Sequence, residues 1–149
     1  MTDVRFYHLT KQNLDQALPL ILTKAYKSNK NILVRLSDKK EVERMNAHLW
    51  AYRSDSFLPH GCHKEGNAQH QPIWLTHKEE NPNNAQIVIL AQGAQATSLE
   101  GYDLCCIMLD GRSDDQVQAA RIKWKAYKEE GLDITYWMQN ESGGWEQKT

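Results

Sequence analysis

The sequence predicts an α/β protein with three layers, α/β/α, and a mainly parallel central sheet. Short apolar segments rich in β-branched residues alternate along the chain with segments whose apolar residues recur every three or four positions. Strands that alternate with helices in this way are joined by right-handed crossovers, which place the helices on the faces of the sheet. At 149 residues the chain has the size of one domain, and we expect residues 1–149 to form a single one.

The first half of the chain contains two predicted strand–helix units. Residues 4–9 read V-R-F-Y-H-L, which is typical of a strand, and residues 14–25 carry apolar side chains at helical spacing. Residues 31–36 (N-I-L-V-R-L) predict a second strand. Asp38 and Glu41 have the spacing of a capping box and predict the start of a second helix.

The segment after this helix, residues 49–61, reads L-W-A-Y-R-S-D-S-F-L-P-H-G. The residue before a proline is disfavoured in a helix, so the run F-L-P indicates that the helix has ended. We therefore expect the end of a helix followed by an apolar loop. Residues 61–71 are polar and contain glycine, and they predict a surface loop.

The second half of the chain continues the alternation. Three apolar segments predict strands, at residues 72–75, 86–90 and 104–109, with a turn at 81–84. The helix with the clearest signals begins after Ser113, a candidate N-cap, and ends before Gly131, which suits the position after a helix. Residues 132–138 predict a final strand, and the tail from Gln139 onward is hydrophilic apart from Trp145.

The composition limits the classes of partner. Apolar residues make up 40% of the chain and charged residues 25%, and the formal net charge of -1 gives no overall bias toward nucleic acid or membrane. The sequence has no apolar leader segment and no run of the roughly 18 apolar residues that a membrane span needs, so we expect a cytoplasmic protein without membrane contact. The three cysteines, Cys62, Cys105 and Cys106, are expected to be reduced, the adjacent pair as small apolar residues of a buried strand.

An α/β fold raises the question of a nucleotide site. The sequence contains neither G-x-x-x-x-G-K-[S/T] nor a G-x-G-x-x-G after the first predicted strand, where glycines would allow the backbone to approach phosphate. The segment after Leu9 reads T-K-Q-N-L-D instead. We therefore expect no cofactor, because the α/β fold class alone is not evidence for a nucleotide site.

A second candidate is a group of zinc-ligand residue types between residues 60 and 77. A structural zinc site normally needs four ligands in closely spaced pairs. Here only one such pair is present, and the spacing favours solvent-exposed loop histidines and no metal. The alternative, a metal-binding or enzymatic protein that uses this loop, stays open. The residues concerned are His60, Cys62, His63, His70 and His77.

The most informative stretch lies in the helix between Ser113 and Gly131. Arg121, Lys125 and Lys128 are spaced i, i+4 and i+7, so they line one helix face, with Trp124 beside them and Lys123 at the flank. One interpretation is a solvated outer face, with Trp124 packed on the sheet. Another is a site for an acidic peptide or a terminal carboxylate, where arginine binds the carboxylate and the indole covers an apolar side chain. A third is direct binding of single-stranded DNA by stacking.

Several motifs, in a fixed order along the whole chain, resemble one family. The most specific are L-W at 49–50 followed by S-F-L-P-H-G at 56–61, and K-W-K-A-Y-K at 123–128. Together with V-R-F-Y-H-L at 4–9, Q-P-I-W-L-T at 71–76 and the closing T-Y-W-M-Q and G-G-W-E, they make the sequence similar to the chi subunit of bacterial DNA polymerase III holoenzyme.

The resemblance implies a Rossmann-like or P-loop-like topology without a nucleotide-binding loop, and a non-catalytic accessory subunit of the clamp-loader assembly. Chi proteins bind the acidic C-terminal tail of single-stranded DNA-binding protein, which ties the polymerase to coated template and gives indirect contact with single-stranded DNA. Carried over by motif, Arg121, Trp124 and Lys125 would bind the tail, with Lys128 and Lys123 as electrostatic helpers.

The same resemblance suggests a function for residues 49–61. Where chi forms a heterodimer with the psi subunit, psi packs on the S-F-L-P-H region. Trp50, Phe57, Leu58 and Pro59 therefore resemble a docking surface for psi or another clamp-loader component. The alternative is that Trp50 and Phe57 only close one edge of the core.

Overall fold

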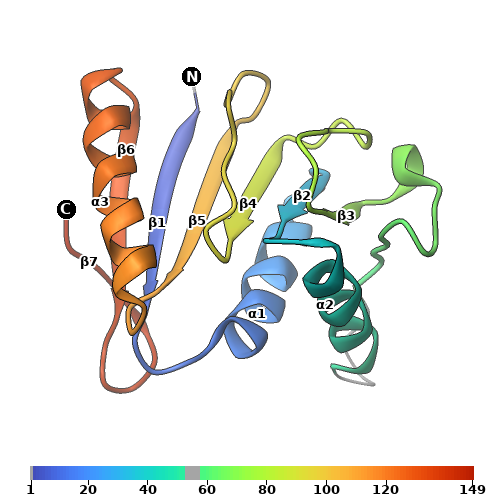
Figure 1. Ribbon diagram of the computed structural model, residues 1–149, viewed down its shortest axis with the longest axis horizontal. Helices are drawn as coiled ribbons and strands as arrows, with labels where there is room; N and C mark the ends of the chain where they lie inside the picture. The colour runs from blue at the N-terminus through green and yellow to red at the C-terminus, as the bar shows by residue number, and fades with distance from the viewer. Residues whose placement is uncertain (1, 53–57) are drawn as a thin grey trace.

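The computed structural model describes residues 2–52 and 58–149. Seven strands form one sheet in the order β3-β2-β4-β5-β1-β6-β7, and every neighbouring pair is parallel except β6 with β7 (Figure 1). The strands are β1 Asp3–Leu9, β2 Ile32–Arg35, β3 Ile73–Thr76, β4 Ile87–Ala91, β5 Leu104–Asp110, β6 Asp133–Gln139 and β7 Trp145–Gln147. The helices are α1 Leu14–Tyr26, α2 Lys39–Ala51 and α3 Asp114–Glu129, with a 3-10 turn η1 at Ala68–His70.

The sheet separates two apolar clusters, one on each face. Leu18 and Leu22 of α1 pack with Met45 of α2 in one cluster. Ala120 and Tyr127 of α3 belong to the other, together with side chains from the segment between β4 and β5. This arrangement is the predicted α/β/α sandwich. Within the residues described, none of the helices is both long and apolar enough to cross a bilayer.

The helices begin at the residues that the capping pattern predicts. Asp38 accepts a hydrogen bond from the Glu41 backbone N–H at 2.8 Å, although the Glu41 carboxylate binds Arg44 instead of closing the capping box. The Ser113 hydroxyl accepts from the Gln116 N–H at 3.3 Å and starts α3. After α3, Gly131 adopts a φ of 80°, a left-handed conformation that glycine allows without strain.

The structure corrects two expectations about the loops. Residues 61 and 62 are buried and do not belong to a surface loop, because Gly61 pairs with Trp74 beside β3. The Gly61 N–H donates to the Ile73 carbonyl at 3.0 Å, and its own carbonyl accepts from the Leu75 N–H at 2.9 Å. The short extended segment thus shields the edge of β3.

The hydrophilic tail is the second correction, because it forms strand β7 against β6. A turn in which the Asn140 N–H donates to the Gly144 carbonyl at 2.8 Å reverses the chain. Trp145 then packs edge-on against Tyr7, with ring centroids 5.0 Å apart. The cross-strand pairing and this one aromatic contact hold a segment whose composition alone indicates a loop.

A buried arginine joins the loops at the carboxyl end of β2. Arg35 is 4% exposed, and its Nε donates to the Lys78 carbonyl at 3.0 Å. Its Nη1 donates both to Glu79 Oε2 at 2.9 Å and to the Gln95 carbonyl at 2.8 Å. A buried cation needs such partners, so the loops after β3 and β4 are fixed by this one side chain.

At the carboxyl end of β1, the buried side-chain amide of Gln139 fixes the turn that follows the strand. The Gln139 side-chain oxygen accepts hydrogen bonds from three consecutive backbone N–H groups, those of Thr10, Lys11 and Gln12, at 3.1, 3.0 and 3.0 Å. Gln139 is 5% exposed. The turn between β1 and α1 is therefore held by the last residue of β6.

Candidate binding surface on helix α3

Helix α3 is fixed on the sheet by one apolar stripe. Ala120 and Tyr127 are buried, and Val117 and Trp124 pack against the same cluster at partly buried positions. These residues recur at spacings of three and four, so the opposite side of α3 faces solvent. The sheet thus presents the outer surface of α3 as a rigid helical face.

The predicted basic stripe lies on the exposed part of this helix. Arg121, Lys125 and Lys128 are all exposed. In the part of the chain that the structure describes, none of the three forms an ion pair. Seven residues of α-helix cover about 10 Å, so three positive charges follow one another along roughly two turns. The stripe therefore remains available to an external anion.

Trp124 connects the stripe to the core. Its ring is in edge contact with Phe6, with centroids 5.8 Å apart, and with Tyr136, at 5.9 Å. The side chain is only partly buried. The indole therefore packs on the sheet, as the first interpretation predicts, and part of its apolar surface stays exposed beside the cations.

Two polar residues beneath the stripe were not predicted from the sequence. His8 Nδ1 and the Tyr136 hydroxyl lie 2.6 Å apart, on neighbouring strands. Burial lowers the pKa of His8, the Asp110 carboxylate opposes that shift, and the positive charge of Arg121 adds to it. Burial raises the pKa of Tyr136, and Arg121 acts in the opposite direction. Arg121 therefore acts electrostatically on the pair from the end of the stripe nearest the carboxyl end of β1.

An exposed isoleucine is a further residue that sequence reasoning missed. Ile122 is 71% exposed, which is unusual for a large apolar side chain. It stands between Arg121 and Lys123 and lies one helical turn before Lys125. A helical wheel could have detected it, because Ile122 is a large apolar residue that lies outside the inward stripe of Val117, Ala120, Trp124 and Tyr127.

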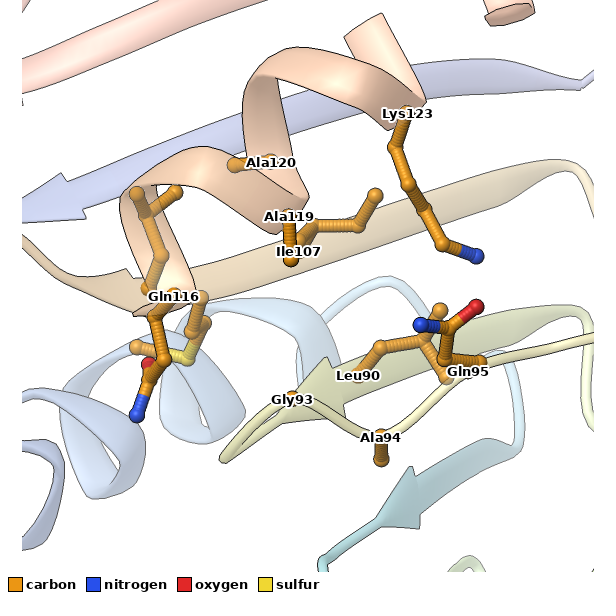
Figure 2. Close-up of a pocket in the computed structure, with 11 residues that line it drawn as sticks. Leu90, Gly93, Ala94, Gln95, Ile107, Gln116, Ala119, Ala120 and Lys123 are labelled. Atoms are coloured by element: carbon orange, nitrogen blue, oxygen red, sulfur yellow. The ribbon is translucent and has the colours of Figure 1, made fainter. Parts of the chain in front are cut away.

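Lys123 lies on the other flank of α3, away from the stripe. It lines a small, mainly apolar hollow between α3 and the segment after β4, and Figure 2 shows it extending from the helix toward Gln95. Its ammonium lies 5.6 Å from the centroid of the Tyr127 ring, and burial lowers its pKa. The structure therefore separates Lys123 from the three cations that it neighbours in sequence.

The predicted docking residues are placed in different environments. Trp50 is 47% exposed, and its ring lies over His60 with centroids 4.1 Å apart. Leu58 is 4% exposed and belongs to the core beneath α1 and α2, whereas Pro59 is partly buried. Phe57 lies outside the described residues. Among the described residues, Trp50 and Pro59 could therefore contact a partner here, whereas the Leu58 side chain is packed in the core.

The histidine and cysteine group is dispersed. His60 is 2% exposed, contrary to the expectation of a solvated loop histidine, and its ring nitrogens lie 2.6 Å from the Leu58 carbonyl and 3.2 Å from the Asn46 carbonyl. Cys62 is buried, and burial raises the pKa of its thiol. His63 lies 3.4 Å from Glu43, and His70 is exposed. Over residues 2–52 and 58–149, no three His, Cys, Asp or Glu side chains are grouped as metal ligands.

Comparison with known proteins shows which family this chain is similar to. The family model described as DNA polymerase III chi subunit, HolC, matches residues 1–135. A protein of Rickettsia prowazekii (strain Madrid E) named probable DNA polymerase III subunit chi is 30% identical over 90 residues, which are 60% of this chain and 54% of that protein. The chain thus matches about half the length of that relative. The DNA polymerase III subunit chi of Escherichia coli (strain K12) is 22% identical over 121 residues, 81% of this chain and 82% of that protein.

Proposed function

The chain belongs to the family of DNA polymerase III chi subunits, and from this premise we propose that it acts in DNA replication as a non-catalytic accessory subunit of the polymerase complex. Its proposed task is to bind the acidic C-terminal tail of single-stranded DNA-binding protein through α3, and so to link the clamp loader to coated template. The observation that carries this proposal is the row of three exposed cations without ion pairs within the described residues, beside an indole anchored to the sheet.

The chemistry of the stripe suits an anionic peptide. A guanidinium binds a carboxylate with two parallel hydrogen bonds, which is the proposed role of Arg121. Lys125 and Lys128 would attract the acidic side chains that precede the terminus. The outer part of Trp124 supplies apolar surface for a hydrophobic residue of the tail, and the exposed Ile122 offers a second apolar contact on the other side of the basic stripe.

A second proposed contact is with psi or another clamp-loader component near Trp50 and Pro59. The half-exposed indole lies over a histidine ring that is itself buried and hydrogen-bonded to the Leu58 carbonyl. A rigidly supported aromatic side chain at the surface is typical of the centre of a protein–protein interface. Replacing Trp50 by alanine should then weaken binding of the clamp-loader component without altering tail binding at α3.

Tail binding can be tested with a fluorescent peptide that carries the last residues of single-stranded DNA-binding protein. Arg121→Glu/Lys125→Glu should reduce its affinity at least tenfold, because two attractive contacts become repulsive. Lys39→Glu/Lys40→Glu is the matched control, since it reverses two exposed lysines on α2 and should bind as the natural chain does. Equal affinity of the α3 variant and the control would show that the tail binds elsewhere.

A further inference from the structure

One part of the sheet face opposite α3 is not covered by a helix. Figure 1 shows α1 and α2 beside β2 and away from β6 and β7. At this place the surface forms a hollow of about 520 Å³, whose floor is made by strands β1, β6 and β7. Parallel strands normally have both faces covered, so an open face on the parallel pair β1–β6 calls for an explanation.

Strand alternation brings a specific set of side chains into this hollow. Val4 and Phe6 of β1 point into the cluster under α3, so Arg5 and Tyr7 point to the other face. The register pairs Arg5 with Thr135 and Tyr7 with Trp137, and paired residues share a face. We call this set the β1–β6–β7 platform; it consists of Arg5, Tyr7, Thr135, Trp137 and Trp145, with Lys24 of α1 at its border.

The aromatic rings of the platform are held in place by their neighbours. Trp145 contacts Tyr7 edge-on, at 5.0 Å between centroids and an interplanar angle of 71°. The Trp137 indole N–H donates to the Thr135 hydroxyl at 2.9 Å, which fixes the orientation of that ring. All three aromatic side chains are partly exposed. Rings that are fixed in this way and open to solvent can stack on planar ligands with little loss of conformational freedom.

The charges of the hollow are arranged in two zones. Arg5 and Lys24 form no ion pair in the described part of the chain. Asp3 and Asp133 are paired in register at the amino ends of β1 and β6, and both line the hollow. Aromatic faces beside cations suit bases and phosphates, and carboxylates at one rim can accept hydrogen bonds from the N–H groups of bases, including the ring N–H of thymine.

The geometry points to a binding site for a short single strand of nucleic acid on the β1–β6–β7 platform. The platform is a face of the sheet, so a peptide lying on it would meet side chains and not the free edge of β7. The charged groups among its aromatic rings do not suit the apolar side of a helix. It lies on the face opposite α3, so tail and nucleic acid can bind at the same time.

The site can be tested by fluorescence anisotropy with a short fluorescein-labelled oligothymidine at physiological salt. Trp145→Ala and Arg5→Gln should each weaken binding by about tenfold, since each removes one stacking or phosphate contact. Trp145→Phe keeps a ring and should retain most of the affinity. Circular dichroism and thermal midpoints of all variants establish that they are folded.

The tail-site variant Arg121→Glu/Lys125→Glu separates this inference from the function proposed above. The platform is supported if this variant binds oligothymidine as the natural chain does while losing the tail peptide. Three results would overturn it: no binding of oligothymidine by the natural chain, loss of oligothymidine binding only in the α3 variant, or loss of the tail peptide in Trp145→Ala. The last result would identify the platform as a peptide site.

Discussion

The Gln139 side-chain oxygen accepts a hydrogen bond from the Lys11 backbone N–H at 3.0 Å and bridges the end of β6 to the turn that follows β1. The same oxygen also accepts hydrogen bonds from the backbone N–H groups of Thr10 and Gln12, so one buried acceptor satisfies three backbone donors. Strands that are adjacent in the sheet but distant in the chain are thereby joined beyond their backbone pairing.

Removing this acceptor should destabilise the fold. In Gln139→Ala three N–H groups near the surface lose their partner, and we expect the free energy of unfolding to fall by about 1–3 kcal/mol. Urea unfolding followed by circular dichroism measures the change. Gln147→Ala, at an exposed position of β7, is the control and should change stability by less than about 0.5 kcal/mol. A loss no larger than that of the control would contradict the proposed role of the amide.

Substitutions of Trp124 and Ile122 should distinguish an effect on stability from an effect on tail binding. Trp124→Ala removes the contacts with Phe6 and Tyr136 and should cost about 1–3 kcal/mol of stability, less than a fully buried tryptophan. Ile122→Ser changes a solvent-facing side chain and should leave stability within about 0.5 kcal/mol. If Ile122 forms part of the tail site, its variant should bind the tail peptide several-fold more weakly. Unchanged affinity would remove Ile122 from the site.

Arg44 should make a pH-dependent contribution to the packing of α1 on α2. It binds Asp15 at 2.7 Å and Glu41 at 3.0 Å, and these hydrogen bonds lower the pKa of both carboxyl groups. A depressed folded-state pKa adds stability above the unfolded value, and that stability is lost as the pH falls through the folded value. Arg44→Met should therefore cost up to about 1 kcal/mol at neutral pH, the range for exposed ion pairs.

The difference between Arg44→Met and the natural chain should shrink as the pH falls below about 4, where both carboxyl groups become protonated. Urea midpoints measured across the acid range report it. If the deficit of the variant persists unchanged at the lowest pH at which the chain is folded, packing and not charge explains the effect.

The cysteines should react only when the chain unfolds. Cys62, Cys105 and Cys106 are buried, and burial raises the pKa of Cys106 to about 12. Because the thiolate is the reactive form, the native protein should react with Ellman's reagent far more slowly than the denatured protein. Ser28→Cys places a thiol at an exposed position and should react at once. Prompt labelling of the natural chain would show that at least one of the three buried thiols is accessible in the folded state.

Most of the fold follows from local patterns in the sequence. The capping residues Asp38 and Ser113 and the αL position Gly131 are read correctly because each acts on its own neighbours along the chain. Strand β7 could not be predicted in the same way. Its pairing with β6 and the contact of Trp145 with Tyr7 depend on the sheet being already formed.

In the candidate site, too, the features that depend on neighbours along the chain could be predicted, and those that depend on the folded sheet could not. The row Arg121, Lys125 and Lys128 follows from helical periodicity, and the structure places all three at the surface. The pair of His8 and Tyr136 beneath it could not be predicted, because the residues come from β1 and β6, distant in sequence. The burial of His60 likewise depends on carbonyl groups from Leu58 and, across the fold, from Asn46.

The position of β1 between β5 and β6 affects how the chain can fold. Strand β1 has neither of its neighbours until β5 and β6 have been synthesised, so this part of the sheet is closed by contacts of very long sequence separation. We expect the sheet to be completed only after β6 has been synthesised, with the apolar side chains of β1 exposed in the meantime. A chaperone that holds β1 until β6 has been synthesised would therefore raise the yield of folded protein more than one that acts later.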